Sequence, residues 1–300
     1  MNELQKRIIE LKHEKNALIL AHYYQSLDIQ AVADHVCDSF ELAKRAGASE
    51  EKLLVMCGVR FMAESAKILS PEKTVLLPVP DAGCPMADMI KPEDVRRLKH
   101  EYPDAAVVCY VNSSAAVKAE SDICCTSSSA EKIVRSLPNK KIIFIPDCNL
   151  GAYIASKVPE KEIILYEGHC PIHNTVREKD VLAAKKAHPN AQVLAHPECR
   201  PEVLKYADYI GSTSGILEAA EKSHAHEFII GTEVTIAEKL SAQFSEKKFY
   251  PMTGEFLCPD MKKISLPNLL SSLENMEHEI ILDKDEMDKA RSSLEKMVNI

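Results

Sequence analysis

Three stretches of this chain end alike, with a short apolar run that leads into a polar loop carrying a cysteine. The runs are TVLLPVPDAGC, KEIILYEGHC and KKFYPMTGEFLC, which end at Cys84, Cys170 and Cys258. The cysteines are separated by 86 and 88 residues, which is a nearly fixed interval. Self-similarity at a long, fixed interval indicates repeated structural units, so the spacing predicts three similar units that each deliver one thiol.

The segments before these cysteines repeat one order of strands and helices. The middle third reads AVVCYVNSS, SDICCTSSSAEKIV, KIIFIPDCNLGAYIA and KEIILYEGHC; the last third reads QVLAHPECR, ADYIGSTSGILEAA, EFIIGTEVTIAEKL and KKFYPMTGEFLC. The first third is similar but less regular, and helical patterns at 92–101 and 178–187 enter the second and third units. Strands that are apolar on both faces and alternate with helices indicate parallel sheets covered on each side.

The sequence therefore predicts an α/β fold of three homologous αβα lobes, Rossmann-like with parallel sheets, around a pseudo-threefold axis. The expected boundaries are 1–90 for lobe 1, 91–175 for lobe 2, 176–262 for lobe 3 and 263–300 for a C-terminal helical segment. Leu4, Ile8 and Leu11 mark an amphipathic helix at the start of lobe 1. The alternative is one continuous doubly wound sheet in which the cysteine spacing is a coincidence.

The net charge and the hydropathy of the chain disfavour some classes of binding partner. The net charge of −8 disfavours a surface for nucleic acid or anionic membranes, because those partners reward clustered Lys and Arg. No apolar run reaches the roughly 18 residues that a membrane span requires. The N-terminus is charged and lacks the apolar stretch of a signal peptide, so we expect a cytoplasmic protein.

The ten cysteines, in a reducing compartment, are expected to be thiols or metal ligands. No C-x-x-C pair is present, so local zinc ribbons and thioredoxin-type motifs are unsupported. Small core residues are expected at Cys37, Cys57, Cys109, Cys124, Cys125 and Cys148, whereas Cys199 follows the polar cluster HPE and is harder to assign. Three thiolates brought to one metal cluster would leave a coordination position open for Lewis-acid catalysis.

Polar side chains follow the predicted strands at the ends where ligands bind in parallel α/β units. They are His22, Tyr24, Asp38, Ser39, Tyr110, Asn112, Ser113, Thr126, Ser127, His196, Glu198, Ser212, Thr213 and Ser214. Singly, many of these are explained as helix N-caps or structural histidines. Their recurrence in all three units favours one shared site instead.

The chemistry of this set suggests a small anionic substrate. The set is rich in His, Ser, Thr, Asn and Tyr but poor in Arg and Lys, and helix N-termini such as GSTSG bind anions through N–H groups and hydroxyls. Glu198 or Tyr24 could move protons, and His22 and His196 could do so or bind anions.

Eleven short motifs follow one another along nearly the whole chain: ILAHYYQ, DHVCDSFELA, GVRFMAESAKIL, AGCPMADM, YVNSS, CTSSSA, GHCPIH, AHPEC, GSTSG, GTE and CPDMKK. This ordered combination resembles the quinolinate synthase family. The resemblance implies condensation of iminoaspartate with dihydroxyacetone phosphate to quinolinate, phosphate and water in de novo NAD biosynthesis. It also implies one [4Fe-4S] cluster per chain, held by Cys84, Cys170 and Cys258, with the fourth iron open as a Lewis acid. A functional link to an aspartate oxidase or dehydrogenase that supplies iminoaspartate follows as well.

The resemblance also assigns site residues. The implied substrate-binding residues are His22, Ser39, Tyr110, Val111, Asn112, Ser127, His196, Pro197, Glu198 and Thr213. Tyr24 matches a tyrosine of the proton steps, Glu198 is the expected general base with His196 beside it, and His22 completes the catalytic set. His173 in HCPIH is a weaker match, and the role of Ser214 stays open.

Two other readings remain at this point. A different hydro-lyase with an open [4Fe-4S] iron would carry the same three thiolates but would not consume dihydroxyacetone phosphate. An iron–sulfur or zinc-binding sensor would use the thiols as a switch, although it would not need the matched polar groups at the strand ends.

Overall fold

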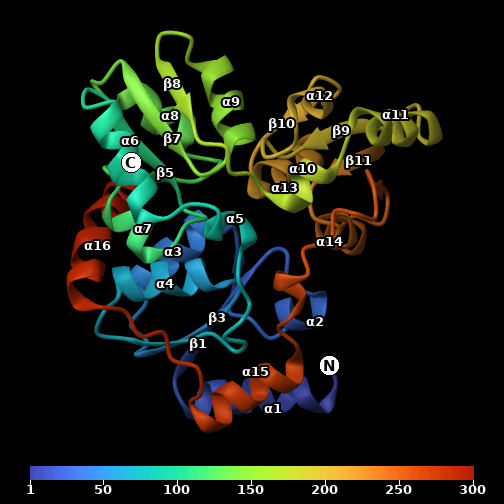
Figure 1. The fold of residues 1–300 in the computed structure, drawn as a ribbon. Coiled ribbons are helices and arrows are strands. Elements are labelled where there is room, and N and C mark those ends of the chain that lie inside the picture. Colours follow the sequence, from blue (N-terminus) through green and yellow to red (C-terminus); the bar gives the residue numbers. More distant parts are fainter.

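The computed structural model describes residues 1–300 and contains three separate four-stranded sheets, all of whose strand pairs are parallel (Figure 1). The first sheet has the order β2 (His35–Cys37), β1 (Ala17–His22), β3 (Leu53–Cys57), β4 (Thr74–Leu76); the second β6 (Ile123–Cys125), β5 (Ala106–Tyr110), β7 (Lys141–Ile145), β8 (Glu162–Leu165); the third β10 (Tyr209–Ile210), β9 (Gln192–Ala195), β11 (Glu227–Gly231), β12 (Lys248–Pro251). One strand order thus occurs three times. This confirms the predicted α/β class and excludes a single continuous sheet.

Helices connect the strands and cover the sheets. Those up to the second sheet are α1 (Glu3–Glu14), α2 (Leu27–Gln30), α3 (Ser39–Ala48), α4 (Arg60–Leu69), α5 (Pro85–Asp88) and α6 (Pro92–Glu101). The next are α7 (Ala115–Ala119), α8 (Ala130–Ser136), α9 (Cys148–Lys157), α10 (Pro171–Thr175) and α11 (Glu178–Ala187). The remainder are α12 (Pro201–Leu204), α13 (Thr213–Lys222), α14 (Thr235–Gln243), the 3-10 helix η1 (Asp260–Lys262), α15 (Leu266–Asn275) and α16 (Lys284–Val298). The helices expected at 92–101 and 178–187 are α6 and α11.

The threefold repeat extends to individual side-chain contacts. In each sheet an aspartate just before the edge strand accepts a hydrogen bond from a backbone N–H of the central strand. The pairs are Asp34 with Ile19 at 2.8 Å, Asp122 with Val107 at 2.7 Å and Asp208 with Val193 at 2.7 Å. These positions are 88 and 86 residues apart, so the same contact fixes the same strand pair in all three sheets.

Replacing Asp208 by Ala is expected to lower the free energy of unfolding by about 1–3 kcal/mol, because it leaves the N–H of fully buried Val193 without its acceptor. Chemical denaturation followed by circular dichroism measures the change. Glu246→Ala, an exposed position in the same third of the chain, is the control and should change stability by less than about 0.5 kcal/mol. Equal stability of the two variants would show that the contact is dispensable.

The apolar core is divided unequally among the sheets. A single cluster of 60 buried residues runs through the first two sheets and includes residues of α15 and α16. The third sheet packs on two smaller clusters of its own, with 11 and 9 residues. Helix α16 contacts α4, α7 and β6, and α15 lies against α1 (Figure 1). The C-terminal helices therefore reinforce the first two sheets.

The N-terminal helix forms as expected, but its buried stripe differs from the prediction. Helix α1 buries Gln5, Ile8, Leu11 and Lys12, whereas Leu4 is 38% exposed. Lys12 Nζ lies 2.8 Å from Asp34 Oδ1, so the helix turns this side toward β1 and leaves Leu4 at the edge of the stripe. No helix in this fold combines the length and the apolar character that a membrane crossing would require.

Candidate active site

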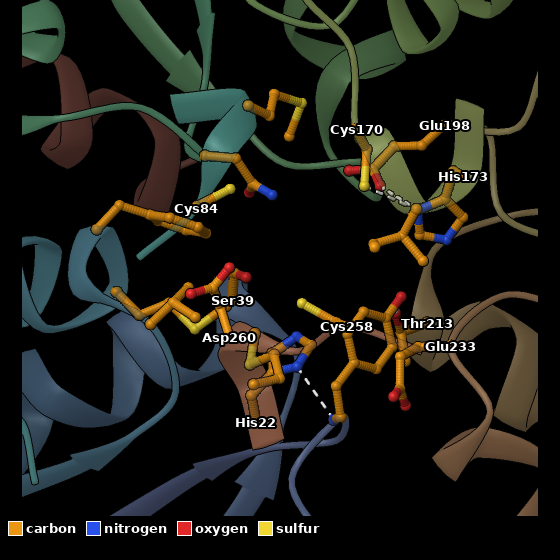
Figure 2. A pocket seen from close by; sticks show the side chains of 18 of the residues that line it. His22, Ser39, Cys84, Cys170, His173, Glu198, Thr213, Glu233, Cys258 and Asp260 are labelled. Carbon is orange, nitrogen blue, oxygen red and sulfur yellow. Dashed lines mark hydrogen bonds and ion pairs between the residues drawn. The ribbon is translucent and has the colours of Figure 1, made fainter. Parts of the chain in front are cut away.

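A cavity of about 320 Å³ is lined by residues of all three repeats (Figure 2). It brings together twelve of the fourteen residues that the family resemblance assigned to the cluster, to substrate binding or to catalysis. They are His22, Tyr24, Ser39, Cys84, Tyr110, Asn112, Ser127, Cys170, His196, Glu198, Thr213 and Cys258.

Val111 and Pro197 are the two that do not line this cavity, and both are buried. The backbone N–H of Val111 donates to Cys125 O at 2.8 Å, and its carbonyl accepts from Ser113 N at 2.8 Å. Both backbone groups of Val111 therefore already have protein partners.

The cavity is built from equivalent positions of the three repeats. His22, Tyr110 and His196 end or follow the central strands β1, β5 and β9 and are 88 and 86 residues apart. The same intervals relate Tyr24, Asn112 and Glu198, and again Ser39, Ser127 and Thr213. The cysteines come from the loops after β4, β8 and β12. The strand-end rule for parallel sheets thus accounts for the whole set.

The three cysteines line the same cavity in a poorly solvated environment. Burial raises the pKa of Cys84 to about 12, raises that of Cys170 well above its ordinary value, and raises that of Cys258 as well. Cys258 adds to the shift at Cys84, and Cys84 adds to the shift at Cys170, because neighbouring thiolates would repel. A partly buried set of soft donors, in a cavity whose lining has no Lys or Arg, fits a metal cluster, whose charge would stabilise the thiolates.

Asp147 orients one of these cysteines, and sequence reasoning missed it. Its Oδ2 accepts the backbone N–H of Cys170 at 3.0 Å, and its Oδ1 caps α9 through Leu150 N at 2.8 Å. Asp147 is completely buried between β7 and α9. One side chain therefore fixes the Cys170 loop relative to the second sheet.

Glu198 is the centre of the polar network. The Tyr110 hydroxyl donates to Oε1 at 2.7 Å, and Oε2 lies 2.8 Å from His173 Nδ1 and 3.8 Å from His196 Nδ1. Burial alone would raise the pKa of Glu198, but His173, His196 and the Tyr110 hydroxyl together outweigh burial and hold it below the ordinary value. Glu198 is thus an ionised carboxylate at neutral pH.

His22 and His196 are neutral in this environment. Desolvation, with a contribution from His196, lowers the pKa of His22 to about 3, and desolvation lowers that of His196 to about 4. Nδ1 of each ring accepts a backbone N–H, from Tyr24 in one case and Glu198 in the other, so Nε2 carries the proton. If either histidine binds an anion, it therefore does so as an uncharged N–H donor, through Nε2.

These two histidines should make the protein sensitive to mild acid. The two histidines have a lower pKa in the folded protein than in the unfolded chain. Below about pH 6.5 the unfolded chain therefore binds more protons, and the free energy of unfolding decreases as the pH falls toward 4. We expect a loss of about 2 kcal/mol per histidine between pH 7 and pH 5, measured by urea unfolding of cluster-free protein. His22→Asn should flatten this pH dependence, whereas exposed His224→Asn should not. An unchanged slope in His22→Asn would contradict the assignment.

Tyr24 reaches from the first repeat into the third. Its hydroxyl lies 3.1 Å from Thr213 Oγ1 and 2.8 Å from Thr232 Oγ1. Thr232 Oγ1 is in turn 3.0 Å from His173 Nε2, so hydrogen bonds connect Tyr24 with His173 and Glu198. Burial, with a contribution from Glu198, raises the pKa of Tyr24 well above its usual range, which keeps the phenol protonated. Thr232 lies in the GTE motif, which the sequence flagged without a role.

The lining contains four carboxylates and no Lys or Arg. Besides Glu198, they are Asp38, which accepts from Ser214 Oγ at 2.5 Å, Glu233, which pairs with Lys262 Nζ at 2.9 Å, and Asp260, which pairs with Lys263 Nζ at 2.9 Å. Each carboxylate thus has its own donor, and Ser214 has a structural role.

Groups suited to an anion remain at the helix starts. Ser39 and Thr213 open α3 and α13, and both line the cavity. The amide oxygen of Asn112, another lining residue, is buried without a hydrogen-bond partner. A bound molecule with a donor group would satisfy it.

The remaining cysteines do not enter the cavity lining. Cys199 is completely buried in the third sheet's core, with Sγ 3.4 Å from Gly231 O, so it is a core residue. Cys57, Cys109, Cys124 and Cys125 are buried as expected. Cys37 and Cys148 are only half-buried, because each lies where a strand or loop passes into a helix at the surface of its sheet.

Known proteins resemble this chain along nearly its whole length. The family profile described as "Quinolinate synthetase A protein" matches residues 6–299. A quinolinate synthase of Caldicellulosiruptor saccharolyticus is 52% identical over 300 residues, covering 100% of this chain and 99% of the relative. One from Clostridioides difficile is 52% identical over 292 residues, with 97% and 96% covered, and "Quinolinate synthase 2" of Methanosarcina acetivorans is 50% identical over 297 residues, with 99% and 96% covered.

Proposed function

The chain belongs to the quinolinate synthase family, and on this premise we propose that it condenses iminoaspartate with dihydroxyacetone phosphate to form quinolinate, phosphate and water. Quinolinate is the pyridine precursor of NAD, so the reaction serves NAD biosynthesis. The supporting observation is the single cavity in which three cysteines meet His22, Tyr24, Glu198 and the other matched residues. An enzyme that oxidises or dehydrogenates aspartate must supply the iminoaspartate.

We propose that Cys84, Cys170 and Cys258 hold one [4Fe-4S] cluster per chain. Their thiols share one cavity, and no Lys or Arg lines it to neutralise free thiolates. When bound, the cluster supplies a Lewis-acidic iron that no protein thiol holds, suited to assisting loss of a hydroxyl as water. The backbone contact from Asp147 would keep Cys170 in place for it.

The protein's own groups bind and orient the substrates. Ser39 and Thr213 hydroxyls at helix N-termini bind carboxylate or phosphate oxygens, since N–H groups and the helix dipole favour negative charge there. The buried amide oxygen of Asn112 accepts from an amine or hydroxyl. Neutral His22 and His196 donate through Nε2 without adding charge.

Glu198 and Tyr24 carry the proton steps. The ionised carboxylate of Glu198 accepts the proton released as the carbon–carbon bond forms, and the Tyr110 and His173 contacts hold it in place. The phenol of Tyr24 remains protonated and donates where a leaving oxygen gains charge.

The direct test is product formation by protein purified without oxygen. Quinolinate should be detected by chromatography when iminoaspartate and dihydroxyacetone phosphate are both present, with one phosphate released per quinolinate. Omitting dihydroxyacetone phosphate should abolish the product. Turnover of iminoaspartate without the triose phosphate would instead indicate another hydro-lyase.

A further inference from the structure

We propose that Cys170, His173 and Glu198 form a site for a single divalent ion, preferably Zn²⁺, in protein that lacks the iron–sulfur cluster. The site would share Cys170 with the cluster, so the two metal centres would exclude each other. This exclusion rests on the proposed function, whereas the zinc site itself rests only on the side chains described below.

The three donor atoms already face one another. His173 Nδ1 lies 3.2 Å from Cys170 Sγ and 2.8 Å from Glu198 Oε2, and the ligand atoms of all three residues lie within 4.8 Å of one another. A tetrahedral zinc ion would hold such S, N and O donors about 3.3–3.6 Å apart. The two distances from His173 Nδ1 would therefore widen by about 0.3–0.5 Å, and Cys170 Sγ and Glu198 Oε2 would settle at the same spacing.

The donor types and their charges select zinc. Thiolate, imidazole and carboxylate together match a borderline-soft ion, whereas Mg²⁺ and Ca²⁺ prefer oxygen alone. One thiolate and one carboxylate balance the two positive charges while the imidazole stays neutral. Binding releases the thiol proton of Cys170 to solvent. The fourth position would face the cavity, as at catalytic zinc sites with three protein ligands.

Each of the three ligand residues also makes a hydrogen-bonding contact with another residue, which orients it. His173 Nε2 lies 3.0 Å from Thr232 Oγ1, which leaves Nδ1 as the ligand atom. Glu198 Oε1 accepts the Tyr110 hydroxyl at 2.7 Å, which leaves Oε2 on the side of His173, where a zinc ion would replace the direct contact of 2.8 Å between Oε2 and Nδ1. The backbone N–H of Cys170 is anchored by Asp147 at 3.0 Å. Such outer contacts orient metal ligands and tune affinity.

The other two cysteines are not part of this group. Figure 2 shows Cys170, His173 and Glu198 gathered together, with Cys84 and Cys258 on other sides of the cavity. A cluster would need all three thiols but not His173, whereas zinc would need His173 but neither Cys84 nor Cys258. This difference gives each centre its own set of diagnostic variants.

The test uses the full-length chain without its cluster, dialysed against Zn²⁺ or Co²⁺ in the absence of oxygen. One ion per chain should bind to the native sequence and to Cys84→Ser, and none should bind specifically to His173→Asn. Bound Co²⁺ should show charge-transfer absorption for one thiolate rather than three. That reading on the native protein decides the matter even if a variant misfolds.

A second pair of variants probes the support behind His173. Thr232→Val keeps the shape but removes the hydroxyl, and should weaken zinc binding by about 10- to 100-fold. Thr232→Ser restores the hydroxyl and should recover most of the affinity. Equal zinc affinity of the two variants would overturn the proposed role of Thr232 in holding His173.

Competition completes the test. Protein preloaded with Zn²⁺ should fail to assemble the iron–sulfur cluster until a chelator removes the zinc, whereas His173→Asn should assemble it in the presence of zinc. Loss of zinc binding in Cys84→Ser, retention in His173→Asn, or a three-thiolate Co²⁺ spectrum would each overturn the site. Absence of quinolinate formation would sink the proposed function and leave the zinc result standing.

Discussion

Replacing Cys84 by Ala is expected to abolish both the iron–sulfur cluster and quinolinate formation. Iron and acid-labile sulfide should fall from about four of each per chain to background in protein purified without oxygen. The reason is that Cys84 supplies one of only three thiols that line the cavity, and no neighbouring cysteine lies there to replace it. Metal analysis and product chromatography on the same preparation measure both effects.

Cys199→Ala is the matched control for this variant. Cys199 is a buried cysteine of the third sheet's core, outside the cavity lining, so the variant should keep the full cluster and its activity. Quinolinate made by an iron-free Cys84→Ala protein would contradict the role assigned to the cluster.

The second large effect is expected from Glu198→Gln. The amide has nearly the same shape and still accepts the Tyr110 hydroxyl, but it cannot take up a proton. Turnover should fall by about 10²- to 10⁴-fold, the usual contribution of a positioned general base. The iron content should stay at the native level, because Glu198 is not a cluster ligand.

Glu202→Gln serves as the comparison for the loss of a nearby carboxylate. Glu202 pairs with Arg200 near the start of α12, away from the cavity lining, so its amide variant should turn over at the native rate. Native turnover in Glu198→Gln would show that another group accepts the proton.

Local pattern was sufficient to predict the fold class and most of the site. Apolar runs followed by polar turns identify parallel strands, and strand ends identify where ligands bind. For that reason His22, Tyr110 and His196 could be named as cavity residues from the sequence. The three cysteines were separable from the other seven because only they recur in all three thirds of the chain at nearly the repeat interval.

Contacts between distant segments could not be predicted in this way. Tyr24 reaches Thr213 and Thr232 across 189 and 208 residues, and no periodicity reports which side chains meet at such separations. The exposure of Leu4 likewise depends on how α1 rests against β1 and α15. Both outcomes are decided by packing between elements.

The repeat interval also predicts equivalent buried residues that the sequence analysis did not identify. Asp147 and Glu233 are 86 residues apart, each two residues beyond the third strand of its sheet, and both are fully buried carboxylates. Aligning the three thirds of the chain at 88 and 86 residues would have paired them. It would also have paired the three aspartates that hold the central strands.

A structure built from three similar units has to bind a molecule that lacks threefold symmetry. Here the positions that build the scaffold kept one residue in all copies, as Asp34, Asp122 and Asp208 show. The positions that face the cavity diverged into His22, Tyr110 and His196, while the thiols stayed alike. Identical residues thus remain where each copy performs the same task. Different residues stand where a molecule without threefold symmetry would bind, so each unit can offer its own chemistry on the same framework.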